Sequence, residues 1–223
     1  MERGRRLFPD VPWLLGHEIR ARAARGDYQR AGALLESRLS MPAGPGPTAA
    51  YLIMMEDAAR EFAAHGHADY ADSLRQRAIQ AYLAQPTPLP VAFGSRADAA
   101  RVYFGAGRWR EAHELFTAVL QGAPGSIEAK GYMGVIAARR GDSTEARRMS
   151  DELAALDRPF LNGEQTRWRA RIAAALGEPA AAVRLLQTAI QEGTALGVWL
   201  HVDPTFSLLR EDPQFQEILR PKG

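Results

Sequence analysis

Apolar side chains recur at helical spacing in the stretch from residue 101 to 120, which reads RVYFGAGRWREAHELFTAVL. Gly107 interrupts this pattern, and Ala112, Phe116 and Val119 then resume it on one face of a second helix. The pattern predicts two helices joined by a tight turn. Neither helix could bury its apolar stripe alone, so we expect neighbours of the same kind along the chain.

A glycine followed five residues later by an alanine occurs five times in phase, and a similar apolar pattern flanks each pair. Consecutive glycines are separated by 40, 41, 34 and 36 residues. Such a period predicts an array of helix-turn-helix units. The pairs are Gly26/Ala31, Gly66/Ala71, Gly107/Ala112, Gly141/Ala146 and Gly177/Ala182.

Proline-rich segments divide the array. MPAGPGPT at 41–48 and QPTPLP at 85–90 cannot continue a helix, because proline lacks the backbone donor and clashes with the preceding turn. We therefore expect an N-terminal tail over 1–11, repeats at about 12–40, 49–85, 93–121, 127–157 and 163–193, and a capping segment over 194–223.

The capping segment contains two Asp-Pro pairs, Asp203-Pro204 and Asp212-Pro213. An aspartate directly before a proline is typical of a helix start, because the carboxylate caps the first turn and proline suits its first position. Two short helices are predicted there, and their inner faces should cover the apolar side of the last repeat. The predicted inner residues are Phe206, Leu209, Phe215, Ile218 and Leu219.

The glycine and alanine pattern resembles the tetratricopeptide repeat (TPR), a helix-turn-helix motif of 34 residues. With the glycines at repeat position 15, alanine fills position 20 in all five units. Small residues suit helices whose axes pack closely. The resemblance implies an all-α fold, a TPR-like right-handed α-solenoid of about five helix-turn-helix repeats with C-terminal capping helices. Position 8 holds Ile19, Ala59, Ala100, Gly134 and Ala170.

The ending also looks like the C-terminal end of TPR regions in bacterial kinase, cyclase and winged-helix signalling proteins, through its DPxFxxLRxDPxF pattern. This resemblance implies a signalling origin. The sequence contains no HRD or DFG tripeptide and no glycine-rich phosphate loop.

Composition narrows the function classes. Hydrophobic residues make up 46% of the chain and charged residues 24%, as in globular proteins. The absence of cysteine excludes disulfides and thiolate chemistry. Prolines interrupt the N-terminal apolar stretch, and no apolar run could span a bilayer, so we expect a cytoplasmic protein that does not enter membranes.

No motif for catalysis is present, so we expect that the chain is not an enzyme and uses no cofactor or metal. His65, His67 and Asp69 could hold a metal in principle, but their turn position favours solvated side chains. The pairs His17-Glu18 and His113-Glu114 lack the second histidine of a zinc-binding HExxH motif.

Arginines recur at repeat position 9, which in the TPR family tends to face a concave groove formed by the first helices. The resemblance implies that a peptide or protein partner binds there, and guanidinium groups would favour an acidic one. Arg167 and Arg171 lie one helical turn apart, a like-charge pair that the helix itself does not explain. The predicted groove residues are Arg20, Arg60, Arg101, Phe104, Arg167 and Arg171.

Other interpretations remain open. The arginines could be solvated, or paired with neighbours such as Glu56 and Asp98 at helical spacing. A sequence pI near 9.1 allows nucleic-acid binding, although the net charge is only +2 and acidic residues are interspersed. An enzyme without a recognisable motif is the third alternative. The lysine and asparagine of the family's carboxylate clamp are missing, so this clamp is not expected.

Overall fold

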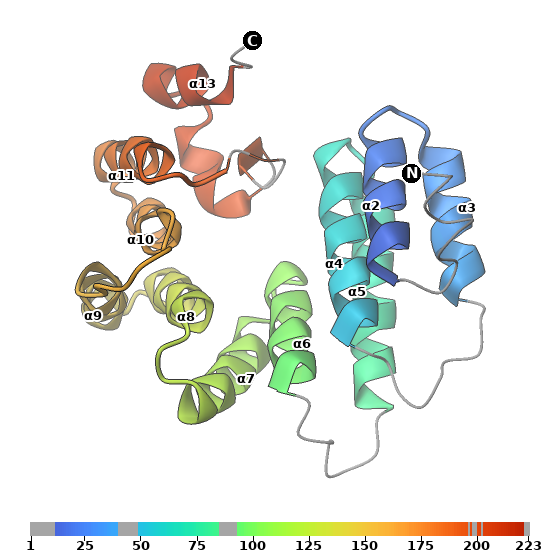
Figure 1. Cartoon of the computed structure of the whole chain (residues 1–223), viewed down its shortest axis with the longest axis horizontal. Helices are drawn as coiled ribbons and strands as arrows, with labels where there is room; N and C mark the ends of the chain where they lie inside the picture. Colours follow the sequence, from blue (N-terminus) through green and yellow to red (C-terminus); the bar gives the residue numbers. More distant parts are fainter. Residues whose placement is uncertain are drawn as a thin grey trace. The chain divides into compact units, whose positions relative to one another are not determined.

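The computed structural model describes residues 12–39, 49–84, 93–195, 197, 200–201 and 203–220, and the regular elements in these ranges are all helical (Figure 1). The expected tail at 1–11 and the linkers at 41–48 and 85–90 lie outside the described residues. The helices are α2 (Pro12–Ala23), α3 (Tyr28–Leu39), α4 (Ala49–Ala64), α5 (Ala68–Leu83), α6 (Phe93–Gly105), α7 (Trp109–Gly122), α8 (Ile127–Arg139), α9 (Ser143–Ala154), α10 (Glu164–Ala175), α11 (Pro179–Gln191), η1 (Pro204–Leu209) and α13 (Pro213–Leu219).

The chain forms two compact units, residues 1–115 and 116–223, and the boundary between them in the sequence falls within α7. In the first unit, α4 packs against α2, α5 and α6. In the second, α10 packs against α8, α9, α11 and η1. Each of these first helices therefore contacts its own second helix and the first helix of a neighbouring pair, which is how stacked repeats bury a continuous core.

The five predicted turn glycines all adopt left-handed backbone conformations, with φ between 72° and 85°. In each turn, the residue after the glycine donates a backbone hydrogen bond of 2.9 Å to the carbonyl five residues earlier, as Arg108 does to Tyr103. This bond satisfies a carbonyl at the helix end. No atom lies within 4 Å of the position that a Cβ would occupy at these glycines, so backbone conformation alone selects the residue.

Small residues fill the helix crossings as predicted. The five alanines at repeat position 20 are completely buried. At the contact between α8 and α10, a Cβ at Gly131 would lie 2.1 Å from Trp168 Cδ2, and one at Gly134 would lie 2.4 Å from Ile172 Cδ1. The absence of a side chain at Gly131 therefore lets the Trp168 ring rest directly on the α8 backbone.

Both Asp-Pro pairs begin helices, the first of which is a 3₁₀-helix. Asp203 Oδ1 accepts a hydrogen bond of 2.9 Å from the Thr205 amide, and Asp212 Oδ1 accepts one of 2.8 Å from Gln214. Phe206 and Phe215 are fully buried in one apolar cluster with residues of α10 and α11. The capping segment thus covers part of the last helix pair. None of the helices in the described ranges has both the length and the apolar character needed to cross a bilayer.

Candidate functional site on the first helices

The six predicted groove residues belong to first helices of the pairs, but their surroundings differ. Four lie in the first unit and two in the second. Arg20 is on α2, Arg60 on α4, Arg101 and Phe104 on α6, and Arg167 and Arg171 on α10.

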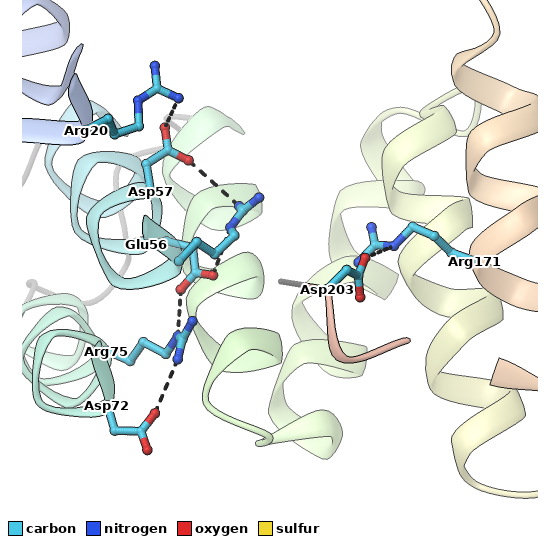
Figure 2. A network of polar contacts seen from close by, with 8 residues as sticks. Arg20, Glu56, Asp57, Asp72, Arg75, Arg171 and Asp203 are labelled. Carbon is cyan, nitrogen blue, oxygen red and sulfur yellow. Dashed lines mark hydrogen bonds and ion pairs between the residues drawn. The ribbon is translucent and has the colours of Figure 1, made fainter. Parts of the chain in front are cut away.

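Asp57 links two of the predicted arginines in the first unit (Figure 2). Its Oδ2 lies 3.7 Å from Arg20 Nη1, and its Oδ1 lies 3.9 Å from Arg60 Nη2. The side chains of Arg20, Asp57 and Arg60 are 35%, 31% and 33% exposed. Positive, negative and positive groups therefore follow one another from α2 to α4, each partly open to solvent.

Glu56 holds the Arg60 side chain in place through a hydrogen bond. Its buried carboxylate accepts hydrogen bonds of 3.2 Å from Arg60 Nε and 3.1 Å from Arg75 Nε, and Arg75 also contacts Asp72 at 3.2 Å (Figure 2). Burial raises the pKa of Glu56, while the charges of Arg60 and Arg75 oppose this rise. A Cβ at Gly105 of α6 would lie 2.7 Å from Glu56 Oε1, so a larger residue there would displace this carboxylate.

The α6 residues are less accessible than predicted. Arg101 is only 18% exposed and lies 2.6 Å from Asp98, one helical turn earlier. Phe104 is buried, with 9% of its surface exposed. Phe104 therefore offers little of its ring to a partner in the predicted groove. The spacing of Asp98 and Arg101 had indicated their ion pair.

Arg171 faces another part of its own chain. Its Nε lies 2.6 Å from Asp203 Oδ2 in the capping segment, and the two side chains are only 12% and 6% exposed (Figure 2). The guanidinium also stacks 4.1 Å from the centre of the Trp168 ring and 5.2 Å from that of Tyr132. The structure thus supplies a role for Arg171 within the fold.

Arg167 lies at the edge of the same cluster. Its side chain is 28% exposed, 3.8 Å from Glu164 and 5.8 Å from the centre of the Trp168 ring. Burial and the neighbouring charge of Arg171 lower the pKa of Arg167. The charges of Arg167 and Arg171 therefore act on each other, as the sequence indicated, and the acidic partner of Arg171 lies 32 positions further along the chain.

The histidines at the turn between α4 and α5 pack against their neighbours. His65 Nε2 lies 3.2 Å from Glu61 Oε1, and the His67 ring lies 4.3 Å from the Tyr28 ring. In the part of the chain that the structure describes, no three histidine, aspartate or glutamate residues come together as a metal site would require.

Comparison with known proteins bears on the fold. No protein-family model and no curated protein matches the sequence. Two solved structures of a Podosopora anserina kinesin light chain with nearly identical TPR-like repeats are similar. One, a point variant, has a TM-score of 0.51 and 20% identity, covering 80% of this chain and 92% of that one. The other has a TM-score of 0.50 and 20% identity, covering 82% and 96%.

At this level of identity the likeness concerns the fold, and it agrees with the periodic glycines and alanines. It does not bear on the resemblance of the capping segment to bacterial signalling proteins, which stays a prediction, as does the cytoplasmic location. The comparison and the helix packing together confirm the predicted fold class: the chain is an all-α solenoid of TPR-like repeats.

Proposed function

We propose that the chain is a protein-interaction module that binds a peptide or protein partner through the α2–α4 surface, defined by Arg20, Ile53, Asp57 and Arg60. Ile53 is a large apolar residue with 37% of its surface exposed, and it lies one turn before Asp57 on α4. An apolar contact flanked by charged groups is typical of a recognition surface. This exposed stripe is the observation that carries the proposal.

The two arginines of this surface favour acidic groups on the partner. Guanidinium groups pair with carboxylates through two parallel hydrogen bonds. Arg60 is held at its Nε by the buried Glu56, so its position is fixed before a partner arrives. Such fixation lowers the entropy lost on binding. A complementary partner would place an apolar side chain on Ile53 and carboxylates beside Arg20 and Arg60.

The other predicted groove residues contribute less to this surface. Phe104 and the arginines Arg101 and Arg171 are all less than one-fifth exposed. Nucleic acid is a poorer fit than an acidic protein. Asp57, next to Arg20, and Asp98, next to Arg101, would repel phosphates. Nucleic-acid binding is therefore an alternative outcome of the test rather than a second proposal.

The test compares two charge-reversed variants in affinity capture from a lysate of the source organism. The double variant Arg20→Glu, Arg60→Glu should lose partners that the unchanged chain retains. The matched control is Arg30→Glu, because Arg30 is also in the first unit and its side chain is 77% exposed on α3. A partner set that is the same for all three proteins would refute the proposal, and partners removed by nuclease treatment would favour nucleic acid.

A further inference from the structure

The capping segment places a carboxylate against the first helix of the last repeat. Asp203 uses both oxygens: Oδ1 accepts a hydrogen bond from the Thr205 amide, and Oδ2 lies 2.6 Å from Arg171 Nε. Leu200 and Phe206, on either side of it, are buried. The segment is therefore held by apolar anchors, and the charged contact lies between them.

Besides Arg171, a second arginine, Arg139, feels the charge of this carboxylate. Burial lowers the pKa of Arg139, the charge of Asp203 opposes that change, and Arg171 adds to it. Burial and the charge of Arg171 also lower the pKa of Arg167. Partly buried cations of the same sign are costly to bring together unless an anion accompanies them. Asp203 supplies that negative charge.

The orientation of Arg171 has support besides Asp203. Its guanidinium stacks on Trp168, whose ring rests on the α8 backbone at Gly131, and it lies 5.2 Å from the centre of the Tyr132 ring. The Tyr132 ring is itself stacked on Phe116, with the centroids 4.6 Å apart. We therefore expect the arginine to keep its position when the carboxylate is removed.

We propose that Arg171, held by the Trp168 and Tyr132 rings, forms a carboxylate-binding site that Asp203 fills as an internal ligand, so that the capping segment closes this surface to acidic partners. The consequence for partner binding rests on the proposed function. The existence of the site does not, and its test requires no partner.

Replacement of the internal carboxylate by a free one provides the test. In Asp203→Ala, the space left by the missing carboxylate, next to Arg171, should bind an acetate ion. We expect the thermal midpoint of this variant to fall by about 5–10 °C. Replacing 0.2 M chloride by 0.2 M acetate should restore about 3 °C of that loss, since a ligand that binds the folded state stabilises it. The unchanged chain should respond equally to the two salts.

Two further variants make the result specific. Asp203→Asn keeps the cap for Thr205 and fills the space without charge, so acetate should have no selective effect on it. Addition of Arg171→Gln to Asp203→Ala should abolish the acetate effect. The proposal is overturned if acetate and chloride act alike on Asp203→Ala, or if the acetate effect survives without Arg171.

A second measurement covers the case in which Asp203→Ala does not fold. In the single variant Arg171→Gln, amide hydrogen exchange over 203–209 should become at least about tenfold faster, while exchange in α11 stays unchanged. Equal protection of 203–209 in both proteins would also overturn the proposal. Because Arg20 and Arg60 are untouched in these experiments, failure here leaves the α2–α4 surface to be judged separately by affinity capture.

Discussion

Gly107 and Gly131 are both poorly replaceable, for different physical reasons. Gly107 has a φ of 72° with open space where a Cβ would project, whereas Gly131 lies in a helix beneath the Trp168 ring. Gly107→Ala should therefore cost about 1 kcal/mol through backbone conformation alone. Gly131→Ala should cost about 3 kcal/mol, because the ring must move. Urea unfolding of both variants checks this prediction, and equal losses would contradict it.

The space at Gly105 accommodates the Glu56 carboxylate, which holds Arg60 on the proposed α2–α4 surface. A methyl group at this position would overlap the Glu56 carboxylate, which holds Arg60. Gly105→Ala should therefore lower stability by about 1–3 kcal/mol and also weaken partner capture. Gly134→Ala is the matched control, because it crowds Ile172 in the second unit. Equal partner capture by both variants, after correction for folded protein, would argue against a role of Glu56 in placing Arg60.

At the level of elements, the stability of α13 depends more on the burial of Phe215 than on the N-cap at Asp212. Asp212 caps the helix, with hydrogen bonds of 2.8 Å from Gln214 and 3.0 Å from the Phe215 amide, while the Phe215 ring is fully buried. Asp212→Ala should cost about 1 kcal/mol. Phe215→Ala should cost about 3–5 kcal/mol. Thermal unfolding of the two variants measures the difference, and a larger loss from Asp212→Ala would refute this ranking.

The elements could be predicted from sequence because their signals are local. A glycine that ends one helix and an alanine inside the next depend on the geometry of one turn, so Gly107 and Ala112 indicated the hairpin directly. The Asp-Pro pairs indicated helix starts for the same reason. Whether the helix at Pro204 is α or 3₁₀ depends on tertiary packing, which the pattern does not contain.

The surroundings of the candidate site were harder to predict. Helical spacing identifies which residues share a face, but not which distant segment covers that face. The contact between Arg171 and Asp203 joins residues 32 apart, and Phe104, a predicted groove residue, is buried. The pair of Glu56 and Arg60 was foreseeable from its spacing, whereas the approach of Gly105 to Glu56 was not.

For the molecule as a whole, ion pairs determine how stability depends on pH. Hydrogen bonds from Arg77, Arg108 and Lys130 hold the pKa values of Glu36, Glu111 and Glu152 below the usual range of a glutamate. The three ion pairs join Glu36 to Arg77, Glu111 to Arg108, and Glu152 to Lys130. Each pair stabilises the fold above pH 4.5, and this contribution is lost as the pH falls through the lowered pKa.

We therefore expect the thermal midpoint to fall between pH 5 and pH 3. Glu56 acts in the opposite sense, because its raised pKa means that its contribution is present at low pH and is lost as the pH rises through that pKa. The double variant Glu36→Gln, Glu152→Gln should show a smaller fall than the unchanged chain, by about 1–3 °C, since both side chains are substantially exposed. Identical pH profiles for the two proteins would contradict this account.

The open space around the turn glycines has a consequence for chirality. A left-handed φ is unfavourable for L-residues but favourable for their mirror images, and nothing near Gly107 would obstruct a methyl group. D-Alanine at position 107, introduced by chemical ligation, should therefore stabilise the chain by about 0.4–1 kcal/mol, because it restricts the unfolded chain without straining the folded one. The same substitution should be tolerated at the other four turns, so mirror-image residues could reinforce every hairpin of the array.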